Sequence, residues 1–506
     1  MPFLRSAIPS VLLVCAACAS SPTSQGDGAK VPTSPSSRES GAATVTSPPS
    51  IPPAPSTAPT AGTASRSLAE EMRAALNELV AVDTSHGHET DALKPLAERL
   101  RAAGLTGVEL LESAPGRGNL IARYKGNGSK KPLLLIAHID VVPVEGQSWS
   151  VPPFQVTEKD GFLWGRGVND DKHMASEMVA VALELAKTKA KLSRDVIFAF
   201  TAGEETGGQA GAKWLAQNHI ELIDAEFALN EGAKLRLTDN GEKMALVEVG
   251  VAEKTFLTFH LSVKGAGGHS SLPTFDGPSA VFTLARALMK VEPYRFPAHL
   301  LPVTKEQFRN AAAFAEKPLA DVLKRIATTG RISPSDDRFL TKEPAYNAMI
   351  RTTCVTTQLK AAPQDNQLPT NAEASVNCRL MPDDTAEHVL GTLTKLIDDP
   401  VVEIRKEEIG AGPYSPIENP VPEAIKEVAG RAWPGVPVTV AMGPGATDSR
   451  HLRAIGIASY GVPLTPVTKQ ELAGGHIAHG PDERHPVRWE AQSVGFFHDL
   501  VVHLAQ

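Results

Sequence analysis

The sequence has little of three things: excess positive charge, cysteine and long apolar runs. It carries 50 lysines and arginines against 57 aspartates and glutamates, a net charge of −7, and it has no long basic stripe. We therefore expect no nucleic-acid partner. None of its four cysteines lies near the histidines and carboxylates considered below, which argues against a closed zinc site of thiolates. The apolar stretch Ala7–Ala17 is about half the roughly 20 residues that a membrane-spanning helix requires.

The amino terminus has the pattern of an export signal. Arg5 precedes the short apolar stretch, which ends in the sequence VCAAC at positions 14–18. That ending resembles a bacterial lipobox, in which Cys18 would be lipidated and become the first mature residue. We therefore predict a lipoprotein-type signal peptide at residues 1–18 and a membrane-anchored protein that faces the periplasm or the cell exterior. An ordinary signal peptide, cleaved after an alanine, is the alternative.

A linker separates this signal from the folded chain. Residues 19–66 consist mainly of Ser, Thr, Pro, Gly and Ala. Such a segment buries too little apolar surface to offset its ordering entropy, so we predict that it is disordered. The folded part is expected to begin at Ser67, where SLAE has capping-box spacing ahead of a helix that extends to about Val80.

Two largely apolar runs lie in the first half of the chain, Pro132–Ala137 and Asp195–Ala202. Such runs are typical of strands buried on both faces of a parallel sheet. A histidine and three carboxylates follow them: His138 and Asp140 after the first run, Glu204 and Glu205 after the second. Because open α/β sheets bind ligands at the carboxyl ends of their strands, we expect these side chains to line a site there.

Imidazole and carboxylates without a thiolate suit zinc that is held for hydrolysis. Glu204 and Glu205 are neighbours at a turn, so their side chains diverge and are expected to have different roles. A dinuclear hydrolase needs ligands for each metal, a bridging carboxylate and a free carboxylate as base. Together with Asp170 of GRGVNDDK, the histidine and carboxylates named above are enough to fill these roles. Each motif alone is also compatible with a solvated turn, and only their joint placement after buried strands favours the metal site.

The order of predicted elements indicates an α/β fold with an insertion. Helix and strand patterns alternate through residues 67–253 and again through residues 384–506, as in a doubly wound, mostly parallel sheet. At Lys254 the pattern changes to KTFLTFHLSVKG, which alternates as a half-exposed strand. We therefore predict that residues 254–383 form a smaller inserted α+β domain, for a lid or for dimerisation, between the two parts of the catalytic zinc domain.

Cys354 and Cys378 are the only cysteines after the linker, and they lie symmetrically about a proposed turn near Asn366. On paired antiparallel strands they would face each other, and an oxidising compartment would preserve a disulfide. A slip of one residue in register would turn one side chain to the other face. Both outcomes stay open.

Short motifs along the chain carry a family resemblance: HIDVVPV, WSVPPF, DGFLWGRGVNDDK, TAGEETGG, ALNEGA, GGHSSLP, DNQLP, GATDSR and HGPDE. Through them the chain, from about Ser67 to Leu504, resembles the dinuclear-zinc metallopeptidases of the carboxypeptidase S, aminoacylase and glutamate carboxypeptidase group. It is most similar to the carboxypeptidase S-like N-acyl-amino-acid hydrolases. The resemblance also implies a cis peptide between Asp170 and Asp171.

Carried over residue by residue, the resemblance implies two zinc ions per chain, with cobalt or manganese as substitutes. The implied ligands are His138 and Glu231 for one ion, Glu205 and His479 for the other, and Asp170 as the bridge. His476 and His485 are the alternatives to His479, which we prefer because it begins HGPDE.

The resemblance implies further roles for residues that bind no metal. Asp140 would orient the imidazole of His138, and Glu204 would be the general base that acts on the attacking water. His269, on the inserted domain, would stabilise the oxyanion. In homodimeric relatives the neighbouring subunit supplies this histidine, so a homodimer is an expected partner.

Four residues resemble the groups that hold a substrate's free carboxylate: Asn366, Arg379, Gly445 and Thr447. An arginine suits this role because its planar fork pairs with a carboxylate through two hydrogen bonds. Two alternatives stay open. Arg379 would instead form an interdomain salt bridge, and Asp448 with Arg450 would pair only with each other.

We therefore predict an exported zinc hydrolase that cleaves an amide next to a free α-carboxylate and so releases an amino acid from a peptide or an N-acyl amino acid. A dipeptidase or aminoacylase of the same fold is the nearest alternative. From another class, the chain would be a lipid-anchored amino-acid or metal-binding protein without turnover. A pure binder has no use for Glu204, so this residue favours the enzyme.

Overall fold

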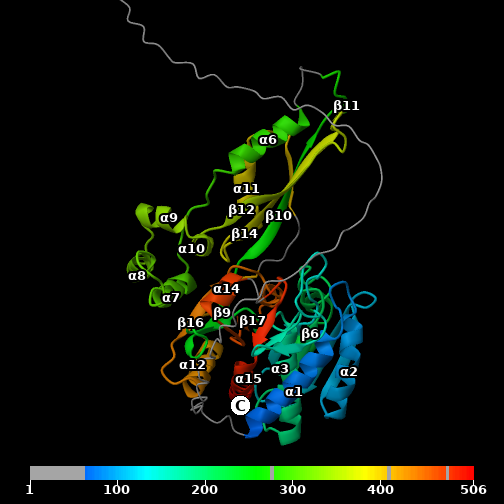
Figure 1. Ribbon diagram of the computed structural model, residues 1–506, viewed down its shortest axis with the longest axis vertical. Coiled ribbons are helices and arrows are strands. Elements are labelled where there is room, and N and C mark those ends of the chain that lie inside the picture. Colours follow the sequence, from blue (N-terminus) through cyan, green and yellow to red (C-terminus); the bar gives the residue numbers. More distant parts are fainter. Residues whose placement is uncertain (1–62, 274–278, 407–411, 475–477) are drawn as a thin grey trace, which may run out of the picture. The chain divides into compact units, whose positions relative to one another are not determined.

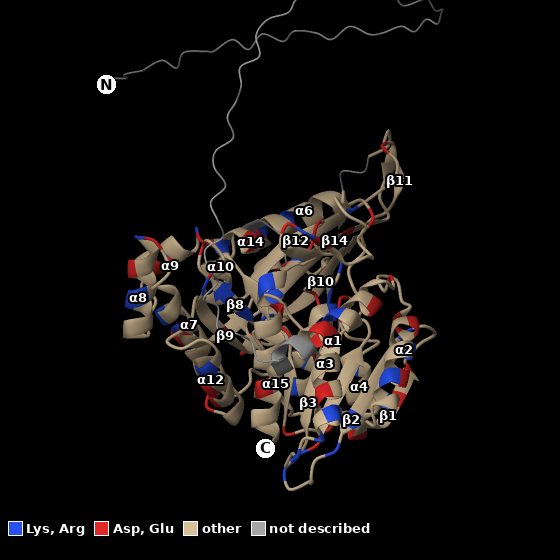
Figure 2. Cartoon of the chain, turned by 60° about the horizontal axis from the view of Figure 1, so that its bottom comes forward, with Lys and Arg blue, Asp and Glu red and all other residues tan. Residues whose placement is uncertain are grey.

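The computed structural model describes residues 63–273, 279–406, 412–474 and 478–506, which lie in one compact unit (Figure 1). The predicted signal peptide, Cys18 and nearly all of the predicted linker lie outside the described residues. No helix within the described ranges is both long and apolar enough to cross a membrane. Acidic and basic residues are interspersed over the described helices and loops (Figure 2).

A ten-stranded central sheet carries the first part of the fold. Its strand order is β1-β2-β6-β3-β7-β17-β9-β8-β18, with β16 paired to β9. The strands are β1 (Thr106–Glu112), β2 (Gly118–Tyr124), β3 (Leu133–His138), β6 (Val196–Thr201), β7 (Phe227–Asn230), β8 (Lys234–Leu237), β9 (Met244–Glu253), β16 (Val438–Gly443), β17 (Ala458–Gly461) and β18 (Thr465–Val467). The neighbours β6, β3, β7 and β17 all run parallel, whereas β1, β2 and β9 bring antiparallel pairings at the flanks.

Helices cover both faces of this sheet. They are α1 (Thr63–Val80), α2 (Glu89–Ala102), α3 (Lys172–Thr188), α4 (Ala212–Asn218), α5 (Ile220–Ile223), α12 (Pro420–Ala432), α13 (Ser449–Ala454) and α15 (Glu490–Ala505). A short helix, α14 (Lys469–Gly474), follows β18. Leu133, Leu135 and Ala137 of β3 pack in a cluster with α1, α2, α3 and α15, while Leu134 and Ile136 pack with α4 and α13. The strand is therefore buried on both faces, which is why its sequence is a continuous apolar run.

The predicted start of the first helix is wrong by four residues. It begins at Thr63, not at Ser67. The residues ahead of Ser67 are Thr, Ala, Ser and Arg, none of which breaks a helix, and the buried side chains of Leu68 and Met72 hold the helix against the core.

A second sheet has its own hydrophobic core. Its strand order is β12-β14-β10-β15, and its strands are β10 (Thr255–Lys264), β12 (Thr353–Lys360), β14 (Asn371–Leu380) and β15 (Glu403–Lys406). Two helices cover it, α6 (Ala280–Val291) and α11 (Ala386–Ile397), and the buried cluster they form is separate from that of the central sheet.

The predicted return to the first domain at Asp384 is wrong. Val389 and Leu393 of α11 are buried in the core of the second sheet, and β15 pairs with β10 through Phe259 and Lys406. The second sheet therefore continues to at least Lys406, more than twenty residues beyond the predicted boundary at residue 383. An amphipathic helix has the same pattern whichever sheet covers it, so the sequence did not distinguish the two.

Between α6 and β12 the chain forms a small helical cluster. It contains α7 (Pro302–Ala311), α8 (Leu319–Thr329), α9 (Pro334–Leu340) and α10 (Pro344–Met349), packed around Phe308 and Leu323. Asn310 of α7 donates a hydrogen bond to Thr439 of β16 at 2.7 Å. The cluster is thus tied to the central sheet.

The disulfide between Cys354 and Cys378 is confirmed, and the two residues are opposite each other in the register of β12 and β14. It closes a loop of 24 residues, for which chain entropy predicts a stabilisation of about 3 kcal/mol. We expect the free energy of unfolding of the C354S/C378S variant to be lower than that of the wild type by about 3 kcal/mol, so the variant should unfold at a lower denaturant concentration. Reductant should lower the wild-type midpoint but not that of the variant. Titratable thiols at both Cys354 and Cys378 in denatured, unreduced wild-type protein would exclude the bond.

Candidate active site

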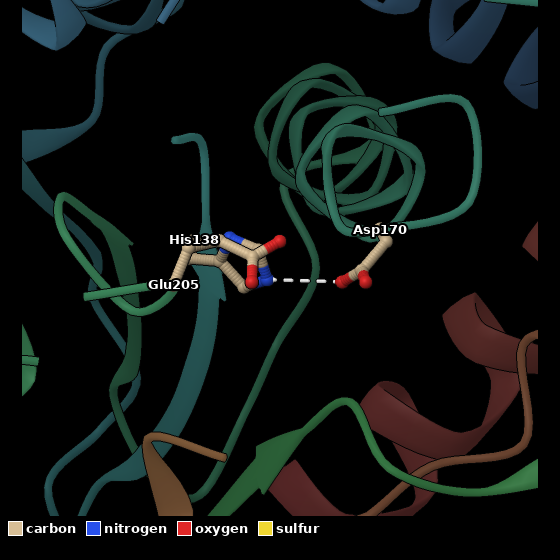
Figure 3. A group of neighbouring side chains, drawn as sticks. All are labelled: His138, Asp170 and Glu205. Carbon is tan, nitrogen blue, oxygen red and sulfur yellow. Dashed lines mark hydrogen bonds and ion pairs between the residues drawn. The ribbon is translucent and has the colours of Figure 1, made fainter. Parts of the chain in front are cut away.

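Acidic residues and histidines meet where the parallel strands of the central sheet end. His138 is the last residue of β3, Glu205 follows β6 and Glu231 follows β7. Because β6, β3 and β7 are parallel neighbours, their carboxyl ends lie at one edge of the sheet. Asp170 reaches the same place from the turn before α3, with its carboxylate toward His138 (Figure 3).

The carboxylate of Asp170 lies between two histidines. Its Oδ1 is 3.2 Å from Nε2 of His138, and its Oδ2 is 3.2 Å from Nε2 of His479. Glu231 lies 3.6 Å from the same nitrogen of His138, and Glu205 lies 3.2 Å from the same nitrogen of His479. The side chains therefore form two subsites, each with one imidazole and one glutamate, that share Asp170. The structure thus brings together the five side chains that the resemblance implies as ligands, and ligand atoms of Glu205 also lie within 4.8 Å of those of His138 and Asp170.

The electrostatics of the site also suit metal ions. Burial, and then the neighbouring Asp170, raise the pKa of Glu231 to about 8. Burial raises the pKa of Glu204 well above its usual range. Hydrogen bonds to Asp170 and Glu205 raise the pKa of His479 to about 10. Without further cations, the protein would have to bind protons to hold these carboxylates together. Divalent ions at the two subsites would supply the missing positive charge, so the donor set fits a dinuclear site.

Asp140 is buried and organises the residues around it. Its two oxygens accept the backbone N–H groups of Glu204 and Glu205 at 3.1 and 3.2 Å. Its backbone carbonyl lies 3.0 Å from Nδ1 of His138, and its Oδ1 lies 3.5 Å from the same nitrogen. Asp140 thus aims Nε2 of His138 at the site and fixes the turn that carries both glutamates.

A cavity of about 560 Å³ opens onto the candidate metal ligands. Asp170, Glu204, Glu205, Glu231 and His479 line one part of it, and Phe256, Asn377, Arg379, Gly445 and Thr447 line another. The guanidinium of Arg379 lies over the ring of Phe256 and forms no ion pair with any described residue. The alternative interdomain salt bridge is therefore not seen within the described ranges, and the charge of Arg379 is free to meet an anion.

Thr447 lines the cavity but has no free donor. Its backbone N–H and its hydroxyl both donate to Glu253, at 3.1 and 2.7 Å. Glu253 also pairs with Arg453 at 3.1 Å. Sequence reasoning missed Glu253, and no motif marks it.

Asp448 accepts a hydrogen bond from Thr201 at 3.0 Å, and no ion pair with Arg450 is seen among the described residues.

His269 and Asn366 lie away from this cavity in their own chain. His269 belongs to β11 (Gly268–His269), which pairs with β13 (Gln367–Leu368), and the backbone carbonyl of Asn366 accepts the N–H of Ser270. The expected grouping of Asn366 with Arg379 is thus not found. Phe256, which is opposite Arg379, is at the start of β10, whereas β11 follows the end of that strand. Ten residues of strand span roughly 33 Å, and Figure 1 shows β11 at the far end of the second sheet.

Among the described residues, neither alternative to His479 is found at the site. His485 is fully buried, stacks on His173 with ring centroids 3.8 Å apart, and lies 2.9 Å from Asn169. It therefore belongs to the core behind the site and does not reach the cavity. His476 lies outside the described residues.

The cis peptide expected between Asp170 and Asp171 is confirmed.

Removing a ligand should lower the metal content. We expect the Asp170→Ala variant to bind fewer metal ions than the wild type, because both subsites lose an oxygen, and the Glu205→Ala variant to lose the ion next to His479. Glu253→Gln is the matched control, since Glu253 lines the same cavity outside the ligand cluster. Elemental analysis after dialysis measures this. Full metal content in Asp170→Ala would contradict the assignment.

Comparison with known proteins places these features in a family. The profile of peptidase family M20/M25/M40 matches residues 134–503. The probable carboxypeptidase S-like 2 of Dictyostelium discoideum is 30% identical over 393 residues, which cover 76% of this chain and 74% of that protein. The N-fatty-acyl-amino acid synthase/hydrolase PM20D1 of Mus musculus is 28% identical over 461 residues, which cover 85% of this chain and 88% of that protein.

A solved structure has the same fold. It is the M20 family metallo-carboxypeptidase Sso-CP2 from Sulfolobus solfataricus, with a TM-score of 0.64 and 18% identity. The match covers 86% of this chain and 98% of that chain. It therefore extends over both sheets, and not over the catalytic motifs alone.

Proposed function

The chain belongs to peptidase family M20/M25/M40, and from this membership and its site we propose that it is a zinc-dependent hydrolase that releases an amino acid from an N-acyl amino acid or a peptide. The observation that carries the proposal is the shared carboxylate of Asp170, which lies between the His138–Glu231 and His479–Glu205 subsites. When bound there, two zinc ions would supply Lewis acidity that polarises the scissile carbonyl and acidifies the attacking water.

The chain's own residues then handle the proton and the orientation of the ligands. Glu204 lines the cavity beside the proposed metal ligands, and burial raises the pKa of its carboxyl group, which makes the carboxylate a stronger base. It would take a proton from the water that attacks the carbonyl carbon and deliver that proton to the leaving nitrogen as the C–N bond breaks. Asp140 keeps His138 and the backbone of Glu204 in place throughout.

Arg379 would hold the free α-carboxylate of the substrate. It is the cation that the second sheet contributes to the cavity, and it has no ion-pair partner among the described residues. A hydrogen-bonded charge pair is worth roughly 1.5 to 3 kcal/mol, so Arg379→Met should lower kcat/KM about 10- to 100-fold. Substrates whose carboxylate is capped as an amide should show no such loss. Arg405→Met, on the exposed strand β15 of the same sheet, is the control. An equal loss on free and capped substrates would exclude this role.

The test of the function itself is a panel of N-acyl amino acids and dipeptides, assayed with zinc, cobalt and manganese. Hydrolysis of N-acyl amino acids with long or short acyl groups would favour the acyl-amino-acid hydrolase, and dipeptides alone would favour a dipeptidase. A protein that binds metal and amino acids but hydrolyses none of the panel would be the binding protein of the alternative class. The names of the relatives favour hydrolysis.

The remaining proposals concern place and assembly. We propose that the chain is exported by its amino-terminal signal, is anchored by lipid at Cys18 toward the periplasm or the cell exterior, and works as a homodimer. The sequence VCAAC supports the anchor. The distance of His269 from the cavity of its own chain supports the dimer. Radiolabelled fatty-acid incorporation into the wild type but not into Cys18→Ser tests the anchor.

A further inference from the structure

Arg166 and Glu483 form a buried ion pair behind the candidate metal site. Arg166 follows β5 (Phe162–Trp164), Glu483 precedes β19 (Arg484–Pro486), and the antiparallel pairing of these strands brings the two residues close together, with Gly165 bonded to the backbone carbonyl of Glu483. Nη1 of Arg166 donates to Oε2 of Glu483 at 2.7 Å, and both side chains are 1% exposed. Burying two charges is costly, so such a pair calls for a reason beyond the local contact of two short strands.

Glu483 holds the turn that carries the bridging carboxylate. Its Oε1 accepts the backbone N–H groups of Asn169 and Asp170 at 2.8 and 3.2 Å. Its other oxygen accepts Arg166. The backbone position of Asp170 is thus fixed from behind by one carboxylate.

Arg166 holds the backbone of His479. Its Nη2 donates to the carbonyl of His479 at 3.3 Å and to Oε1 of Gln147 at 2.8 Å. The amide nitrogen of Gln147 donates to the same carbonyl at 2.8 Å. The Arg166 guanidinium also lies 5.0 Å from the ring centroid of Trp149. The guanidinium therefore links Glu483, and through it Asp170, to His479.

His479 needs this support more than His138 does. Its side chain is 59% exposed, and its backbone has a φ of 64°, a left-handed conformation that few non-glycine residues adopt. His138 is instead 2% exposed at the end of a central strand, and Asp140 holds its Nδ1. The central sheet therefore fixes the histidine of the His138–Glu231 subsite. The histidine of the His479–Glu205 subsite depends instead on contacts to the loop that carries His479.

We propose that Arg166 and Glu483 are positioning residues that hold Asp170 and His479 at the spacing required by the second metal ion, the one next to Glu205. This inference rests on the proposed dinuclear site. It predicts a selective effect, in which the ion at His138 and Glu231 stays bound while the ion at His479 and Glu205 is lost first.

The test titrates the metal-free full chain with zinc against a chromophoric chelator and yields two dissociation constants. We expect Arg166→Lys to weaken the second ion roughly 10- to 100-fold while the first changes by less than about threefold. Glu483→Gln should weaken the second ion by a similar factor and the first by a smaller one, because Asp170 is shared by both subsites. Lysine keeps the charge beside Glu483 but lacks the fork that also reaches His479. Gln147→Leu, which removes no buried charge and so preserves folding, should weaken the second ion by a smaller factor.

Arg194 provides the matched control. It is also buried, pairs with Glu226 at 2.6 Å and lies over the ring of Phe227 at 4.8 Å, but it touches no metal ligand. Arg194→Met should lower the melting temperature and leave both zinc constants unchanged. The inference is overturned if Arg166→Lys and Glu483→Gln bind both ions like the wild type, or if Arg194→Met weakens the second ion equally. A wild type that binds fewer than two ions would instead refute the dinuclear site, and the inference with it.

Discussion

Replacing Glu204 by Gln should reduce kcat by roughly a thousandfold while the protein keeps about two metal ions per chain. Gln has the same shape but takes no proton, so the attacking water and the leaving nitrogen lose their proton carrier. Glu204 lines the cavity next to Glu205 and Glu231, and its backbone N–H is held by Asp140. The variant should therefore fold and position its neighbours as the wild type does.

Metal content decides between two roles for Glu204. Ligand atoms of Glu204, His138 and Glu231 lie within 4.8 Å of one another, so geometry alone would admit Glu204 as a third ligand of that subsite. Elemental analysis of Glu204→Gln beside Glu205→Ala separates the roles. We expect the first variant to retain its metal and the second to lose an ion. Loss of metal in both would make Glu204 a ligand and leave the proton transfer without a base.

The His269→Ala variant should lose about a hundredfold or more in kcat with its metal ions still bound. A donor aimed at a developing oxyanion is worth roughly 3 to 4 kcal/mol. His269 lies on β11 at the end of the second sheet away from Phe256, where its ring meets Ser271 at 2.8 Å. His388→Ala is the control, because this exposed histidine lies on α11, the helix that packs on the same sheet.

Subunit mixing tests where His269 acts. If the partner subunit supplies it, inactive His269→Ala and Glu204→Gln chains should recover part of the activity when mixed. One site of the mixed dimer would contain both an intact Glu204 and an intact His269. Subunit exchange is verified first with tagged chains. A mixture that exchanges subunits and stays inactive would show that the histidine acts within its own chain, by closure of the second sheet over the first.

The sequence by itself determined the central sheet and the residues that end its strands. Burial on both faces forces a strand such as β3 to be apolar at every position, so the next polar residue, His138, marks the strand end. Parallel neighbours end at the same edge, which is why Glu205 was expected beside His138. Glu231 was expected there only from the family resemblance. Symmetry about a turn allowed the Cys354–Cys378 pairing but left it open, and the register of β12 and β14 in the structure decided it.

Tertiary structure alone decided which distant groups meet. The motif HGPDE favoured His479 over His476 and His485, but only the folded chain places His479 beside Asp170 and buries His485 against His173. In the same way α11 proved to pack on the second sheet. Periodicity reports which face of an element is buried. It carries no information about the partner that covers that face, because hydrophobic burial is non-directional and the partner is selected by contacts far apart in the chain.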